Sequence, residues 1–164
     1  MSPQLALCAA LCATLASGCG AGSTLEGSLS EDVSLQFDQV QLQRSTDAVA
    51  LLYLRAVPGG TGNDIIFKLT ATTTGLSLDA PVSIDLAEKI GTSTRGAAER
   101  VVSGDGRGAL PMIARGTLHF SSAPAIGSSV SGNFNLLFPP GGTGTVGAGR
   151  TVFGNFSATV MGAM

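Results

Sequence analysis

Short segments of alternating apolar and polar residues, separated by glycine and proline, restrict this chain more than any other feature. In residues 65–72, Ile, Phe, Leu and Ala occupy the odd positions, and the even positions after Ile66 hold Lys and Thr. Similar segments occur at residues 82–86, 116–121 and 152–160. A period of two is typical of a strand with one buried face, and Gly and Pro between such segments form turns. The pattern predicts an all-β fold: an antiparallel β-sandwich of about eight strands, or alternatively a small closed β-barrel.

Three other segments refine this prediction. The apolar positions of residues 33–37 are odd-numbered and those of residues 40–42 are even-numbered, which predicts a β-bulge near Asp38. Residues 48–57 are apolar on both faces apart from one arginine, as expected for a central strand. Residues 88–113 leave two alternatives open, a short helix or irregular strands.

The pentapeptide Pro-Gly-Gly-Thr-Gly occurs at residues 58–62 and again at residues 140–144. The second copy extends into a G-x-G-x-x-G pattern at residues 142–147. A dinucleotide site needs a helix after these glycines and an acidic residue about 20 positions further on. A strand pattern follows instead, and no Asp or Glu occurs after Gly147. Both copies are therefore interpreted as turns between strands, because Gly adopts positive φ without steric cost.

The N-terminus carries the most specific signal in the chain. Residues 1–18 contain no charged residue, and residues 5–16 are apolar over the length of a signal-peptide core. The sequence Leu-Ala-Ser-Gly-Cys at residues 15–19 resembles the lipobox of bacterial lipoproteins. This resemblance implies cleavage before Cys19, a lipid on its thiol, and, because Gly20 follows rather than Asp, delivery to the outer membrane. The alternative is an ordinary secretory signal that contains a cysteine.

These observations predict three parts of the chain. Residues 1–18 form the signal peptide, residues 19–32 a lipid-anchored flexible tether, and residues 33–162 a single β-sandwich domain. Cys8 and Cys12 fall within the signal peptide, so the mature chain keeps one cysteine and forms no internal disulfide. Glu31 and Asp32, at the end of the tether, are interpreted as a solvated charge pair.

The charged residues suggest one speculative binding site. The chain has 9 basic and 11 acidic residues and no basic cluster, which argues against a nucleic-acid partner. Arg95, Arg100, Arg107 and Arg115 nevertheless lie close together in the least regular part of the sequence. Loops on a rigid scaffold often bind ligands, so we consider a weak anion or carbohydrate contact at these four residues. The alternative is that they are dispersed solubilising charges.

No residue is predicted to be catalytic or to bind a metal or cofactor. His119 is the only histidine, and it lies on the strand face opposite Leu118 and Phe120. No G-x-S-x-G motif accompanies it, and one histidine with one lipid-bound cysteine is a poor basis for a transition-metal site. The sequence thus predicts a lipid-anchored protein of the cell envelope that acts as a non-catalytic binding or structural module. A β-barrel carrier of an apolar ligand and a hydrolase are the alternatives.

Overall fold

The computed structural model describes residues 22–106, 108, 110–141 and 146–163. Within these residues the only helical turn is the short 3-10 helix η1 (Ser28–Glu31). The strands are β1 (Gln39–Arg44), β2 (Ala48–Ala56), β3 (Asn63–Thr72), β4 (Val82–Asp85), β5 (Lys89–Ile90), β6 (Ser93–Thr94), β7 (Gly96–Val101), β8 (Arg115–Phe120), β9 (Ser129–Leu137) and β10 (Thr151–Gly162). The prediction of an all-β fold is confirmed.

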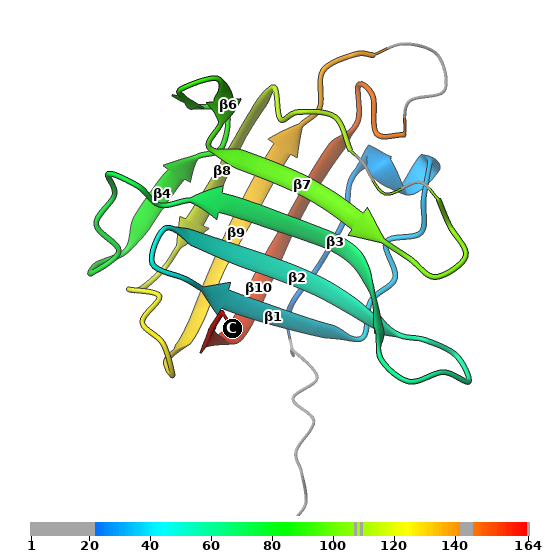
Figure 1. The fold of residues 1–164 in the computed structure, drawn as a ribbon, viewed down its shortest axis with the longest axis horizontal. Coiled ribbons are helices and arrows are strands. Elements are labelled where there is room, and N and C mark those ends of the chain that lie inside the picture. Colours follow the sequence, from blue (N-terminus) through cyan, green and yellow to red (C-terminus); the bar gives the residue numbers. More distant parts are fainter. Residues whose placement is uncertain (1–21, 107, 109, 142–145, 164) are drawn as a thin grey trace, which may run out of the picture.

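Eight strands form one mixed sheet in the order β4-β8-β9-β10-β1-β2-β3-β7. Neighbouring strands are antiparallel except β1 and β10, which run parallel with Leu42 beside Val160. Figure 1 shows β1, β2, β3 and β7 crossing in front of β8, β9 and β10. The sheet therefore folds over itself and is nearly closed into a barrel, the alternative form predicted from the sequence. Its two halves face each other as the layers of a sandwich do, while β5 and β6 form a separate hairpin.

The two edge strands of this sheet, β4 and β7, are connected through Leu86. Its backbone N–H donates to the carbonyl of Gly116 in β8 (2.9 Å), and its carbonyl accepts from the N–H of Gly96 in β7 (2.8 Å). A Cβ atom on Gly96 would lie only 2.7 Å from the Cβ of Leu86. The missing side chain at Gly96 lets the two backbones approach, and this contact closes one end of the barrel.

Two copies of Gly-Asn-Phe form the centre of the sheet, one in β9 (residues 132–134) and one in β10 (residues 154–156). They pair antiparallel with Asn133 opposite Asn155, so each phenylalanine lies opposite the glycine of the other strand. A Cβ on Gly132 would lie 2.5 Å from the ring opposite, and a Cβ on the second glycine 3.1 Å from the other ring. Each glycine therefore leaves room for an aromatic ring in the core, and both asparagines point outward.

The core is built around an aromatic cluster. Tyr53 of β2 makes edge contacts with Phe37 (4.8 Å between centroids) and Phe134 (6.0 Å), and Phe67 stacks on Phe134 at 5.8 Å. The Tyr53 hydroxyl donates to the backbone carbonyl of Asn155 (3.0 Å), which satisfies its polar end. Burial raises the pKa of Tyr53 above its usual value, because a phenolate is poorly solvated there.

Several local predictions can now be compared with the structure. The central position of residues 48–57 is confirmed, because β2 lies between β1 and β3. Residues 97–101 belong to strand β7, which excludes the helix alternative. Of the strand predicted around Asp38, residues 40–42 lie in β1, but residues 33–37 form no strand and the predicted bulge is absent from the β1–β2 pairing. Val33 and Leu35 are buried, but their segment pairs with no strand, and the register shifts lie in β2, β3 and β7 instead.

The two glycine-rich repeats connect neighbouring antiparallel strands. Residues 58–62 join β2 to β3, and the Val57 N–H donates to the Gly62 carbonyl across the turn (3.2 Å). Gly59 and Gly62 have positive φ values of 70° and 104°, so they need glycine. Residues 140–144 lie between β9 and β10, although 142–145 fall outside the described residues. The turn interpretation is confirmed for the first copy.

The prediction of a flexible tether over residues 19–32 is wrong for its described part, residues 22–32. Leu25 and Leu29 are buried in the core, at 7% and 0% exposure. Glu26 exchanges two backbone hydrogen bonds of 2.9 Å with Phe153 of β10. This segment therefore continues the sheet beside the first half of β10, because its two leucines give it apolar area to bury.

Candidate functional site

The predicted arginine site does not form as one surface, because Arg95 is directed into the protein. Its side chain is 6% exposed. One guanidinium nitrogen donates to the carbonyls of Thr72 (2.8 Å) and Thr74 (3.1 Å), and Nε donates to the carboxylate of Glu88 (2.8 Å). The hydrogen bond from Arg95 lowers the pKa of Glu88. Arg95 therefore joins the end of β3 to the β5–β6 region and has a structural role.

Arg100 is also buried, at 4% exposure, and it forms an ion pair with Asp105 (2.6 Å). Arg107 lies outside the described residues. Arg115 is the exception among the described members of the predicted set, since it is exposed at the start of β8. The prediction of a shared arginine contact is thus wrong for Arg95 and Arg100, whose charges are used inside the protein.

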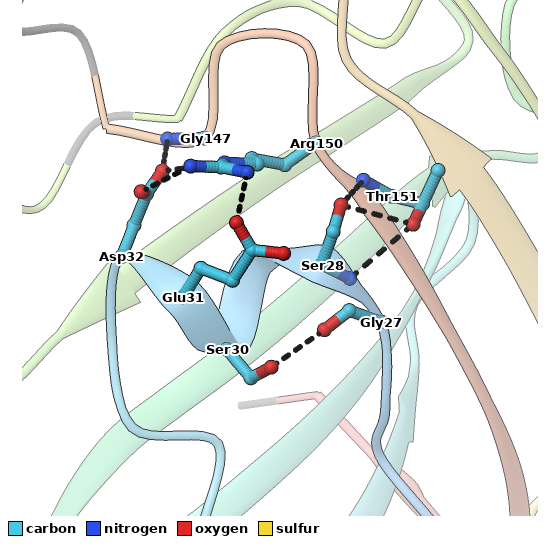
Figure 2. Close-up of polar contacts among 8 residues, drawn as sticks. All are labelled: Gly27, Ser28, Ser30, Glu31, Asp32, Gly147, Arg150 and Thr151. Atoms are coloured by element: carbon cyan, nitrogen blue, oxygen red, sulfur yellow. Dashed lines mark hydrogen bonds and ion pairs between the residues drawn. The ribbon is translucent and has the colours of Figure 1, made fainter.

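Glu31 and Asp32 both bind Arg150 (Figure 2). The interpretation as a solvated pair holds for Glu31, whose side chain is 63% exposed, and is wrong for Asp32, which is 25% exposed. Asp32 accepts from the Arg150 guanidinium at 3.0 Å and from the backbone N–H of Gly147 at 3.1 Å. The hydrogen bond that Arg150 donates to Asp32, together with the charges of Asp32 and Glu31, raises the pKa of Arg150. This contact attaches the end of the N-terminal segment to the chain just before β10, so the acidic residues serve the fold.

An extended polar surface lies on the outer face of β4, β8, β9 and β10, which we call the polar face. The strand register aligns its side chains in rows across the four strands. One row holds Ser83, His119, Asn133 and Asn155, and the next holds Asp85, Thr117, Asn135 and Phe153. These four strands contain one Asp, one Arg and one His, so the polar face has little net charge.

A depression of about 330 Å³ lies in the polar face, where β8, β9 and β10 meet. It is lined by Arg115, Asn135, Leu136, Leu137, Thr151, Val152 and Phe153. Phe153 is 45% exposed although it is a large apolar residue. The site combines an exposed aromatic ring with an amide, a hydroxyl and a guanidinium, which is the usual composition of a small-molecule site. Of these residues only Arg115 is predicted by the sequence analysis.

Phe153 is not among the predicted site residues, although its position in the strand pattern marks it as exposed. In residues 152–160 the core positions are even-numbered, so Phe153 shares its phase with Asn155 and Ser157 on the outer face. An aromatic residue in the polar phase of a strand is an exposed apolar group, and such groups are candidates for ligand contact. The depression could have been located from this position.

Ser83 and His119 form a second arrangement on the polar face. Their side chains are hydrogen-bonded, with 2.9 Å between Oγ and Nδ1. A hydrolytic triad also needs a group that orients the histidine and donors for an oxyanion. Asp85, two residues after Ser83, instead accepts from the backbone N–H of Ala87 (2.9 Å). The serine–histidine pair is thus a cross-strand contact with two of the components that a hydrolase needs.

Comparisons with protein-family models, curated proteins and solved structures found no match for this chain. Across the described residues, no cluster of three or more His, Cys, Asp or Glu side chains is suited to hold a metal ion. The same part of the chain contains no helix with the length and hydropathy needed to span a membrane. The N-terminal sequence and the polar face are therefore the features that bear on function.

Proposed function

We propose that this protein is a lipid-anchored binding module of the cell envelope and that its polar face binds an uncharged carbohydrate without catalysis. The anchor is supported by the lipobox-like sequence that ends in Cys19, a residue outside the described part. Gly20 favours the outer membrane, by resemblance to other lipoproteins.

The observation that carries the binding proposal is the depression beside Phe153. A pyranose ring has an apolar C–H face, which stacks on an exposed aromatic ring, and a rim of hydroxyls. Asn135 both donates and accepts hydrogen bonds, and Arg115 supplies several donors in a fixed geometry. Because the face has little net charge, it suits a neutral polar ligand better than a nucleic acid or a strongly anionic polymer.

The rows of polar side chains across the polar face also favour a polymeric ligand. Asn133 and Asn155 lie side by side at the centre of the sheet, one row away from the depression. Ser131 and Ser157 form the row beyond them. A chain of sugars lying across these rows would contact several strands at once, and many weak contacts would then add to a useful affinity.

The alternative of an apolar carrier has less support. The barrel shape fits it, but the inward side chains of the described strands pack against each other, including the rings of Phe67, Phe134 and Phe156. A fluorescent-lipid displacement assay tests this alternative directly. A displaced signal would favour the carrier over the carbohydrate-binding module.

The proposal is tested by measuring retention of the purified protein on immobilised neutral polysaccharides and on a glycan array. Phe153→Ser and Asn135→Ala are expected to weaken binding about tenfold or more, since each removes a direct contact. Gln41→Ala is the matched control, because Gln41 lies in β1, in the other half of the sheet. Failure to bind any neutral glycan, or equal binding by all three variants, would overturn the proposal.

A further inference from the structure

A second depression, of about 550 Å³, lies at the end of the molecule where β10 finishes. It is lined by residues 44–46, 125–126 and 162–163. The three segments are held together by backbone hydrogen bonds from Ala163 to Arg44 (2.9 Å) and from Gly127 to Val160 (2.8 Å). We call this surface the carboxyl end of β10. Figure 1 marks the C-terminus here, beside β1.

The carboxyl end of β10 exposes apolar side chains. Ile126 is 65% exposed and Met161 is 39% exposed. Their neighbours Ala125, Gly162 and Ala163 are small, apolar and exposed as well. These exposed apolar side chains give this end a surface that can contact another phase or partner.

The charges at this end roughly balance. The Arg44 guanidinium donates to the carbonyl of Pro124 (2.9 Å), and the Asp47 carboxylate accepts from the Ser45 hydroxyl (3.1 Å). Neither sign of charge dominates the turn that carries Arg44 and Asp47. The chemistry of this end is therefore apolar rather than electrostatic.

The N-terminal segment is directed toward the same end. Ser23 accepts the backbone N–H of Ser157 through its hydroxyl (3.2 Å), and the segment runs antiparallel to β10. Followed back from Glu26 to Ser23, the described chain thus runs toward Gly162. The four residues from Ser23 back to Cys19 span at most about 14 Å. Along β10, Gly162 lies about 17 Å from Ser157, and Thr151 lies about 20 Å from Ser157 in the opposite direction.

We propose that the carboxyl end of β10 rests on the lipid surface that holds the anchor, with Ile126 and Met161 entering the interfacial layer. The inference depends on the proposed lipid at Cys19, because a short and firmly attached N-terminal segment brings this end of the barrel to the membrane. Apolar side chains enter about 5–10 Å into the boundary between headgroups and acyl chains. The polar face then stands beside the membrane and remains open to carbohydrate.

The test uses the full lipidated protein in vesicles of phosphatidylethanolamine and phosphatidylglycerol. The mature chain has no cysteine besides Cys19, so Ile126→Cys provides a single free thiol for an environment-sensitive fluorophore. Val101→Cys is the matched control, because Val101 is 58% exposed and lies at the last residue of β7. The first residue of β7, Gly96, is aligned with Arg44 through β3 and β2, so Val101 lies at the opposite end of these strands. The label at position 126 is expected to be quenched by lipid-borne quenchers at least about twice as strongly as the label at 101, as for a group within the interfacial layer.

The possible outcomes separate the two proposals. If the protein floats with the vesicles but quenching is equal at both positions, or stronger at position 101, membrane docking is overturned and the anchor is left intact. Absence of flotation overturns the anchor and the docking with it. Ile126→Ser adds a second measurement: it is expected to leave flotation unchanged and to increase protease access to the 121–128 turn by several-fold, because the turn loses its apolar contact.

Discussion

Replacing Leu29 by alanine tests whether the N-terminal segment is part of the folded domain. Leu29 lies in η1, is 0% exposed and belongs to the hydrophobic core. The change removes three carbon atoms, and at about 0.8 kcal/mol for each buried methylene the lost transfer free energy is about 2.4 kcal/mol. Incomplete collapse around the cavity adds to this, so we expect the free energy of unfolding to fall by about 2.5–4 kcal/mol.

The assay is urea unfolding followed by circular dichroism, with thermal unfolding beside it. For a domain of this size the expected loss corresponds to a fall in Tm of about 5–16 °C. Gln36→Ala is the control, because Gln36 is exposed seven residues further along the chain. Its effect is expected to stay within about 0.5 kcal/mol.

The reasoning is refuted if Leu29→Ala costs no more than Gln36→Ala. Rapid cleavage of residues 23–32 in the wild-type protein under native conditions would refute it as well. Either result would mean that the segment is detached from β10 in solution. It would also remove the geometric link between Cys19 and the end of the barrel, on which the membrane-docking proposal depends.

Three further predictions concern single residues. Hydrogen bonds from Ser103 lower the pKa of Asp64, so its stabilising effect is complete above about pH 4 and is lost as the pH falls through its folded pKa. Urea midpoints of wild type and Asp64→Asn should therefore converge in acid; a constant difference would contradict this. Gly132→Ala should lower Tm, because the added Cβ would lie 2.0 Å from the backbone carbonyl oxygen of His119. Gly106→Ala is the control and should leave Tm unchanged, because its added Cβ meets no atom within 4 Å. Tyr53 is the only tyrosine and tryptophan is absent, so phenolate absorbance near pH ~11 should appear only on unfolding.

The elements that the sequence predicts well are those whose burial follows a local period. β8 alternates cleanly, and its inward residues, such as Leu118, are fully buried. β3 alternates from Phe67 onward, but Ile66, expected on the outer face, is also fully buried because the strand register shifts there. The first glycine-rich repeat also behaves as predicted, because a turn depends on the backbone preferences of adjacent residues. These features need no knowledge of distant parts of the chain.

The features that the sequence does not predict depend on distant partners. Leu29 contributes to the core from a segment of small polar residues, and its neighbour Asp32 binds Arg150, 118 positions away. Arg95 is buried because the carbonyls of Thr72 and Thr74 accept its protons. Hydropathy alone assigns Asp32 and Arg95 to the surface, since it contains no information about such pairings.

The parallel pairing of β1 with β10 is a third long-range feature. Antiparallel neighbours can be joined by short turns, but parallel strands need a distant connection. β1 and β10 are the first and last strands of the sheet in sequence, and their pairing joins its two halves in the middle of the strand order. Local pattern therefore predicts the strands and leaves the choice between sandwich and barrel open.

Within the candidate site, the sequence identifies Arg115 and misses its partners. Asn135 and Thr151 are ordinary outward residues in a strand pattern, and only the register places them beside Arg115. Phe153 is the exception, because its position in the polar phase is visible without a structure. An aromatic residue in the outward phase of a polar strand thus indicates a candidate ligand contact from the sequence alone.

The intact mass of the protein extracted from its native membrane tests the central claim most directly. We expect a chain that begins at Cys19 and carries the added mass of a diacylglyceryl group and an N-terminal acyl chain on that residue. An unlipidated chain, or one that begins at another residue, would contradict the anchor and the membrane orientation derived from it.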